Sequence, residues 1–212
     1  MRPQLDLRLY LVTDAGIAAP RSLADTVRAA LRGGVTVVQL RDPTAGGRGL
    51  FEAAAELVEI LAPTGVPLIV NDRLDVALAA GAQGTHLGQS DLPAQRARAV
   101  AGPDHILGLS AADAGQMASL ADWPAGTVDY LGVGPVRSTA TKVDAGAPIG
   151  LDGLADACRL SPLPCVAIGG IDASNAAAAI HAGAAGVAVV SAICAAVDPA
   201  RAAADLRACV ER

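Results

Sequence analysis

The sequence predicts an α/β fold in which a single (β/α)8 barrel, the TIM barrel, spans residues 1–212. Short runs of Val, Leu and Ile alternate with Ala-rich helical segments, in eight units with a period of about 25 residues. These runs are too apolar to face water on either side, which is typical of parallel strands covered by helices. A doubly wound open sheet is the alternative, but no G-x-G-x-x-G motif follows the first run.

Composition and local boundary signals place each strand and helix. The expected strands cover residues 8–12, 36–40, 67–70, 84–87, 106–109, 129–133, 165–168 and 187–190. The expected helices cover residues 22–32, 50–61, 74–80, 93–100, 113–120, 151–158, 175–182 and 199–210. Ser22 is the expected N-cap of the first helix, and Asp91 is the candidate N-cap of the helix that begins at residue 93. The second helix is expected to pack through the face that carries Phe51, Ala54, Ala55 and Val58.

Composition and charge exclude several classes of partner. The formal net charge of −5 gives no basic face for nucleic acid. No run reaches the roughly 18 consecutive apolar residues of a membrane span, and residues 1–6 lack the apolar core of a signal peptide. We therefore expect a cytoplasmic protein without nucleic-acid or membrane partners. The four cysteines have no C-x-x-C spacing and are interpreted as reduced packing residues, with a zinc site or disulfide as the alternative. The sequence leaves open whether the chain forms a homo-oligomer.

The stretch from Gly132 to Lys142 has the composition of a phosphate-binding loop. It follows an apolar run, contains no apolar side chain larger than alanine after Val136, and carries three hydroxyl groups besides the Lys142 ammonium group. Hydroxyls, free backbone and an ammonium group at a strand end suit the binding of phosphate oxygens. A solvated loop is the alternative, and it is weakened because other strand ends carry similar groups.

Charged and polar residues follow the second, third and fourth expected strands. Gln39 and Arg41 alternate with apolar residues, so both should point toward the barrel mouth, where a guanidinium suits bidentate phosphate binding. The alternative for Arg41 is an ion pair with Asp42. Asp72 and Asp91 follow neighbouring strands and can approach one point. Two carboxylates without His or Cys ligands suit Mg²⁺, which usually shares its shell with substrate phosphates; helix capping is the alternative.

The last four strand ends complete the predicted mouth. Ser110 ends the fifth strand, Gly169 and Gly170 follow the seventh, and Val190 and Ser191 end the eighth. Glycines after strand seven and the amides of a short helix after strand eight form a recurrent phosphate site of this fold. The mouth should therefore bind a monophosphate at strands seven and eight, and a magnesium-bound group of higher charge at strands two to six. Two phosphorylated substrates, or one substrate and a diphosphate leaving group, would meet this requirement.

Seven motifs lie in order along the chain, and the similarity that they carry runs from about Leu9 to Pro199, nearly the whole chain. They are Leu9-Tyr-Leu-Val-Thr-Asp14, Val38-Gln-Leu-Arg41, Val70-Asn-Asp72, His86-Leu-Gly-Gln-Ser-Asp91, Gly132-Val-Gly-Pro135, Thr139-Ala-Thr-Lys142 and Ala167-Ile-Gly-Gly-Ile171. Together they closely resemble the thiamine-phosphate synthase (thiamine phosphate pyrophosphorylase) family. The resemblance implies a Mg²⁺-dependent transferase of thiamine biosynthesis on a (β/α)8 barrel. Such an enzyme joins hydroxymethylpyrimidine diphosphate to a thiazole phosphate, releasing pyrophosphate and forming thiamine phosphate.

The resemblance also implies a role for each residue at the mouth. Asp72 and Asp91 would hold the magnesium ion. The diphosphate would contact Arg41, Asn71, Ser110 and Lys142, of which Arg41, Ser110 and Lys142 are the expected catalytic residues. The pyrimidine pocket would be lined by Gln39 and His86. The thiazole phosphate would be held by Thr139, Thr141, Gly170, Val190 and Ser191, with Gly169 in the same glycine turn.

Two departures from the family pattern concern positive charge near the diphosphate. The family commonly has a lysine two positions after the arginine, where this chain has Pro43, so either Arg48 compensates or turnover is slower. The family also often has aromatic-Pro-Thr where this chain has Arg137-Ser138-Thr139, and Arg137 is a second candidate for the missing charge.

Two other functions fit part of the pattern. A thiazole tautomerase-like isomerase would share the barrel and the thiazole-phosphate site, but it does not need Asp72, Asp91 and Lys142. A non-catalytic thiazole-phosphate binding protein is favoured only by Pro43.

Overall fold

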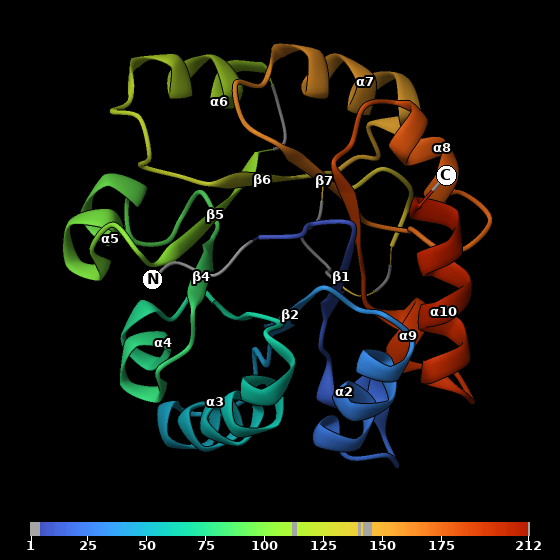
Figure 1. Cartoon of the computed structure of the whole chain (residues 1–212). Coiled ribbons are helices and arrows are strands. Elements are labelled where there is room, and N and C mark those ends of the chain that lie inside the picture. The colour runs from blue at the N-terminus through green and yellow to red at the C-terminus, as the bar shows by residue number, and fades with distance from the viewer. Residues whose placement is uncertain (1–4, 112–113, 140, 142–145, 212) are drawn as a thin grey trace.

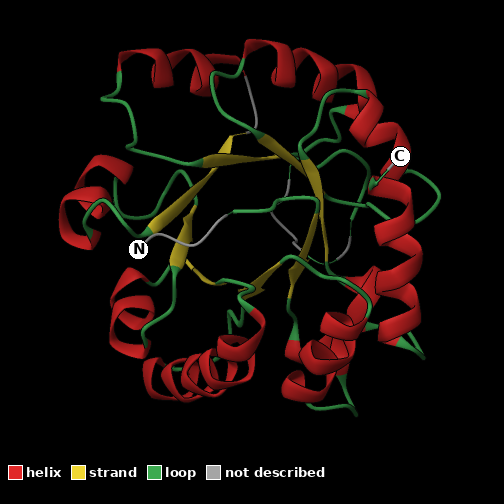
Figure 2. Cartoon of the chain, in the orientation of Figure 1, coloured by secondary structure: helices red, strands yellow, loops and turns green. Residues whose placement is uncertain are grey.

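A closed parallel barrel forms the centre of the molecule. The computed structural model describes residues 5–111, 114–139, 141 and 146–211, and within them eight strands pair in chain order, with β8 pairing to β1. The helices surround the barrel from outside (Figure 1), so that the strands form an inner ring (Figure 2). The predicted (β/α)8 barrel is confirmed.

The strands are short, and their boundaries fall within two residues of the predicted ones. They are β1 (Leu9–Val12), β2 (Val37–Leu40), β3 (Leu68–Asn71), β4 (Gly84–Leu87), β5 (Ile106–Ala111), β6 (Tyr130–Val133), β7 (Cys165–Ile168) and β8 (Gly186–Val189). Because all strands are parallel, their carboxyl ends meet at one face of the barrel.

The expected helices are all present, together with short ones that the sequence analysis did not place. The α-helices are α1 (Ala15–Ala18), α2 (Leu23–Arg32), α3 (Gly47–Leu61), α4 (Leu74–Ala80), α5 (Ala94–Ala101), α6 (Ala114–Ser119), α7 (Gly150–Leu160), α8 (Ala176–His181), α9 (Ser191–Cys194) and α10 (Pro199–Val210). Two single 3-10 turns follow α3 and α6, at η1 (Ala62–Thr64) and η2 (Leu120–Asp122). Ser22 accepts a hydrogen bond from the Asp25 amide, as expected of an N-cap. In the described part of the chain, no helix combines the length and apolarity needed to cross a bilayer.

The face of α3 that packs on the barrel differs from the predicted one. Leu50, Ala54, Leu57 and Leu61 are buried, whereas Phe51 is 40% exposed. The buried residues recur at intervals of four, three and four, which keeps them on one stripe of the helix. Phe51 is one position past Leu50 and is therefore rotated by about 100° away from that stripe. Only Ala54 of the predicted set is fully buried.

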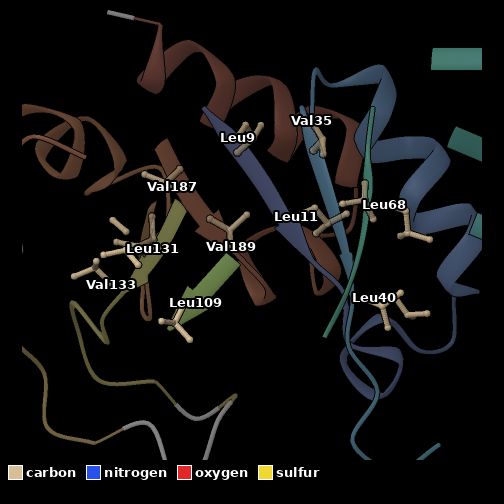
Figure 3. Close-up of a cluster of buried hydrophobic side chains, with 14 of the residues drawn as sticks. Leu9, Leu11, Val35, Leu40, Leu68, Leu109, Leu131, Val133, Val187 and Val189 are labelled. Atoms are coloured by element: carbon tan, nitrogen blue, oxygen red, sulfur yellow. The ribbon is translucent and has the colours of Figure 1, made fainter. Parts of the chain in front are cut away.

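Successive strand residues point to opposite sides of the barrel wall and form two separate cores. The outer core lies between strands and helices and includes Leu9, Leu11, Val35, Leu40, Leu68, Leu109, Leu131, Val133, Val187 and Val189 (Figure 3). The inner core fills the barrel and consists of Leu7, Tyr10, Val12, Val37, Ile69, Ile106, Tyr130, Val166 and Ala188. All four cysteines are free thiols, and Cys165 and Cys194 are buried.

A buried ion pair joins α5 to the starts of β5 and β6. The Arg98 guanidinium lies 3.0 Å from Asp129 Oδ2, with side-chain exposures of 15% and 8%. Arg98 also donates to the carbonyls of Gly102 and His105, and Asp129 accepts from the Leu107 amide at 2.7 Å. The pair therefore fixes the amino-terminal end of the barrel, opposite the predicted mouth.

Replacing Arg98 with methionine should lower the free energy of unfolding by about 3–5 kcal/mol, because it removes the guanidinium that pairs with the buried Asp129. Denaturant-induced unfolding measures this change. The matched control is Arg159→Met, which breaks an exposed pair with Asp156 and should change stability by less than about 1 kcal/mol. Equal losses in the two variants would show that the buried ion pair stabilises the fold no more than the exposed one does.

Candidate active site

A cavity of about 660 Å³ opens at the carboxyl ends of the strands. Its lining contains every described residue that the sequence analysis placed at the mouth, namely Gln39, Arg41, Asn71, Asp72, His86, Asp91, Ser110, Thr139, Thr141, Gly169, Gly170, Val190 and Ser191. Lys142 lies outside the described residues. Barrel closure thus brings together groups that are up to 152 positions apart (39 to 191) in the sequence.

Arg41 reaches the cavity from the end of β2, and its ion-pair partner is Asp14 rather than Asp42. The Arg41 guanidinium lies 3.8 Å from Asp14 Oδ2, and both side chains are about one-fifth exposed. Asp42 instead accepts hydrogen bonds from the Thr44 hydroxyl and amide, and the hydroxyl bond lowers the pKa of Asp42 below its usual value. Asp14 also caps α1 by accepting from the Ile17 amide, which fixes its carboxylate beside Arg41.

The two aspartates predicted to bind magnesium both line the cavity from neighbouring strand ends. Asp91 Oδ2 accepts from the Gly88 amide at 2.7 Å, and the Asp72 amide donates to the His86 carbonyl at 2.8 Å. Neither residue is a helix cap, because Arg73 and Pro93 occupy the N-cap positions of α4 and α5. The prediction that Asp91 caps α5 is therefore wrong: its carboxylate closes its own loop instead.

The backbone at Asp72 has an uncommon conformation. Among the described residues it is the one non-glycine with a positive φ, at 61°. Asp tolerates this left-handed region better than most residues, but the region still favours glycine. Such conformations persist where the surrounding structure imposes them, and they cluster at functional sites. Here the hydrogen bond from Asp72 to β4 provides that restraint.

The donor set at this side of the cavity suits a hard cation. In the described part of the chain, no group of three His, Cys, Asp or Glu side chains could hold a metal ion. Asp72 and Asp91 would therefore supply only part of a coordination shell. Mg²⁺ commonly binds through one or two carboxylates while waters and substrate phosphates complete its octahedron, so the residues fit this ion.

A continuous chain of hydrogen bonds crosses the cavity floor. Gln39 Nε2 donates to the Tyr10 hydroxyl at 2.8 Å, and the Tyr10 and Tyr130 hydroxyls lie 2.7 Å apart. Tyr130 contacts His86 Nδ1 at 3.1 Å, and His86 Nε2 contacts Ser110 Oγ at 3.0 Å. Burial raises the pKa of both tyrosines above the usual value, so both remain protonated at neutral pH. The sequence analysis did not assign a role to Tyr10 or Tyr130.

Glycine at position 108 makes room for this chain. A Cβ atom on Gly108 would lie 2.2 Å from Tyr130 Cζ and 2.5 Å from His86 Nδ1. These rings are buried, so they cannot move aside as an exposed side chain would. Gly132 has a weaker effect of the same kind, because its Cβ would lie 3.1 Å from His86 Cε1 and would crowd the ring without overlapping it.

The β7 and β8 ends present backbone rather than charged side chains. The Gly169 carbonyl accepts from the Arg137 amide, and the Gly170 carbonyl accepts from Asn175 Nδ2. In a trans peptide the N–H points opposite to the C=O, so the amides of Gly170 and Ile171 point away from these partners. Gly169 to Ile171 all line the cavity, as does Ser191 at the start of α9. This side can bind an anion through amides and hydroxyls.

Pro43, which stands where the family commonly has a lysine, also lies at the cavity. Pro43 belongs to the lining, whereas Arg48 and Arg137 do not. Arg48 lies on the exposed first turn of α3, and Arg137 lines a separate shallow depression with Ser138 and Ile149. Neither arginine places its charge at the cavity wall in this structure.

Other cavity residues were not singled out from the sequence. Gln89 donates from Nε2 to the Ser110 carbonyl at 2.6 Å, which joins the β4 and β5 loops, and Gln116 reaches the cavity from α6. Gln89 lies inside the motif around His86, so that motif was the available signal. Gln116 lies in an Ala-rich helix and offered none.

Comparison with known proteins agrees with this geometry. A family model described as thiamine monophosphate synthase matches residues 9–193. The chain belongs to this family. It is 55% identical over 210 residues to the thiamine-phosphate synthase of Xanthobacter autotrophicus, covering 99% of this chain and 98% of the relative. It is 52% identical over 206 residues to that of Azorhizobium caulinodans, covering 97% and 96%.

A solved structure supports the same assignment. Thiamine phosphate pyrophosphorylase from Pyrococcus furiosus matches with a TM-score of 0.88 and 36% identity, covering 98% of this chain and 96% of that chain. The family resemblance stated from the sequence motifs is thus confirmed, and with it the assignment to the transferases of thiamine biosynthesis.

Substituting Gly108 with alanine should lower the free energy of unfolding by about 1–3 kcal/mol, because the added methyl group overlaps the Tyr130 ring. Thermal or denaturant-induced unfolding measures the loss. Gly49→Ala is the control: it lies in α3, where an added Cβ would meet no heavy atom within 4 Å, and should stabilise by about 0.5–1 kcal/mol. Unchanged stability in Gly108→Ala would mean that the floor of the cavity can repack.

Proposed function

We propose that this chain is a Mg²⁺-dependent thiamine-phosphate synthase that joins hydroxymethylpyrimidine diphosphate to thiazole phosphate and releases pyrophosphate. The observation that carries the proposal is the division of a cavity into two unlike halves. The β2–β5 half holds Arg41, Asp72 and Asp91, and the β7–β8 half holds backbone amides and Ser191. A diphosphate with its metal ion suits the first half, and a monophosphate suits the second. A cytoplasmic location stays a prediction from the sequence.

The chemistry follows from where negative charge develops. As the bond between the pyrimidine methylene carbon and the diphosphate oxygen breaks, charge builds on the leaving pyrophosphate. Arg41 would stabilise that charge by donating to the phosphate oxygens, and its place beside Asp14 fixes its position. When bound, Mg²⁺ would neutralise further phosphate charge, held by Asp72 and Asp91.

Bond formation requires positioning rather than a protein nucleophile. The thiazole nitrogen supplies the electron pair for the new carbon–nitrogen bond, so the chain needs only to hold the two substrates in line. Gln39 and His86 would hold the pyrimidine at the floor, and Ser191 with the β7 glycines would anchor the thiazole phosphate. Such anchoring replaces a bimolecular encounter by a reaction between oriented groups.

Incubating the purified chain with both substrates and Mg²⁺ should yield thiamine phosphate and pyrophosphate, and excess chelator should lower the rate on the order of 10²-fold or more. Asp72→Asn and Asp91→Asn should each raise the Mg²⁺ concentration for half-maximal rate at least about tenfold, since lost ligand interactions weaken metal binding strongly. Asn at position 91 can still accept from the Gly88 amide, so its effect reports the lost charge and not a disrupted loop.

The control for charge alone is Asp104→Asn, an exposed residue before β5 at the opposite end of the barrel. It should leave the Mg²⁺ dependence unchanged. Thiazole-phosphate binding without product would favour the non-catalytic binding protein, and conversion of the thiazole phosphate alone would favour the tautomerase. Full turnover in chelator would contradict the assigned role of the aspartates.

Ser191→Ala should raise the KM for thiazole phosphate about tenfold to 150-fold, the effect of one hydrogen bond to a charged group. The KM for the pyrimidine diphosphate should stay within about twofold. Steady-state kinetics with each substrate varied in turn measures both values. Gly170 is unsuitable for this purpose, because its φ of 65° strains any side chain there. Equal changes in the two KM values would mean that the anion sites are assigned wrongly.

A further inference from the structure

The hydrogen-bond chain on the cavity floor allows two arrangements of its protons. In one, each donor points from Gln39 through Tyr10 and Tyr130 to His86 Nδ1, and His86 Nε2–H then donates to Ser110. In the other, every bond is reversed, and His86 carries its proton on Nδ1. Each hydroxyl has one hydrogen, and a buried hydrogen without an acceptor is costly, so a donor at one end of the chain favours the same direction for every bond.

The Gln39 amide is that donor. Its nitrogen faces the Tyr10 hydroxyl at 2.8 Å, and an amide nitrogen only donates. Tyr10 keeps its own hydrogen bonded by giving it to Tyr130, and Tyr130 keeps its hydrogen bonded by giving it to His86 Nδ1. We propose that Tyr130 is a positioning residue that holds His86 as the neutral Nε2–H tautomer, and that this leaves the Ser110 hydroxyl hydrogen directed to the cavity occupant.

Packing keeps the participants in place. Tyr10 and Tyr130 are each 1% exposed, and their ring centroids lie 5.8 Å apart. The His86 ring lies 5.5 Å from that of Tyr130 and is confined by Gly108 and Gly132, where even a methyl group would collide or crowd. A reversed bond would be expensive in this setting, because a buried donor left without an acceptor loses its full hydration.

The consequence for the ligand rests on the proposed function. With the protons ordered in this way, Ser110 presents a donor to the diphosphate substrate, which carries only acceptor oxygens at its phosphates. The reversed order would use the Ser110 hydrogen within the protein and leave lone pairs facing a polyanion. The buried tyrosine pair would thus control the polarity of a group that touches the substrate, although neither hydroxyl needs to touch the diphosphate itself.

The tautomer can be measured without substrate. In the full chain labelled with ¹⁵N-histidine, ring nitrogen spectra distinguish a protonated from an unprotonated nitrogen, and His86→Gln assigns the His86 signals among those of His105 and His181. We expect the His86 Nδ1 signal to be unprotonated and the Nε2 signal protonated. A protonated Nδ1 in the parent chain would overturn the proposal, whether or not the chain makes thiamine phosphate.

Two tyrosine variants of equal size test whether the order of the hydrogen bonds passes from Gln39 to His86 through both hydroxyls. Tyr130→Phe removes the donor to His86 Nδ1 and should give a mixture of tautomers. Tyr10→Phe leaves Tyr130 intact but removes the hydroxyl through which Gln39 sets the direction of the chain, so His86 should again give a mixture of tautomers. An unchanged tautomer in Tyr130→Phe would contradict the role given to Tyr130, and an unchanged tautomer in Tyr10→Phe would contradict the role given to Gln39.

Kinetics test whether Tyr130 acts through Ser110. Tyr130→Phe should lower kcat about tenfold in the parent, the effect of one hydrogen bond. In a Ser110→Ala background the same change should lower kcat by less than about twofold, because coupled residues are not additive. Full additivity would overturn this part of the proposal. If the parent itself forms no product, the proposed function fails while the tautomer measurement still decides the proton order.

Discussion

The limited space inside the barrel is the constraint on which this structure depends. Most strands have four residues, so each contributes only about two inward positions. The inward residues nearer the amino-terminal ends of the strands must fill the barrel. Large side chains enter from some strands because others offer glycine: a Cβ on Gly84 would lie 2.4 Å from Ile69 Cδ1, and one on Gly108 would overlap Tyr130. Large and small residues thus interlock across the interior.

This filling determines where polar groups can lie. Above the apolar layer, the inward residues at the strand ends include Gln39, Asn71, His86 and Ser110, and these line the cavity. Tyr10 and Tyr130 belong to both layers: their rings fill the barrel and their hydroxyls reach the polar layer. Because a buried polar group must find a hydrogen-bond partner, the two tyrosine hydroxyls bond to each other and so join Gln39 to His86 in one network.

The sequence predicted the strands well because β-branched runs between helices carry a local signal. It also predicted which residues surround the cavity, since a parallel barrel brings all strand ends together. The contact between Tyr10 and Tyr130 has no such signal, because β1 and β6 meet only across the closed interior, 120 residues apart. The predicted buried face of α3 was wrong at Phe51, because Ala, Leu and Val occupy several sides of that helix and leave more than one apolar face to choose from. The pairing of Arg41 with Asp14 depends on α1, a single turn too short for periodicity to predict.

The two halves of the cavity differ in a way that matches the proposed reaction. Groups of formal charge, Arg41, Asp72 and Asp91, gather where a diphosphate would leave and its charge would change. The half formed by β7 and β8 offers amides and a hydroxyl, whose dipoles are fixed and carry no proton to lose at neutral pH. A phosphate that serves only as an anchor keeps its charge throughout and needs no more than that. Charged side chains there would strengthen binding of substrate and product alike, without favouring the transition state between them.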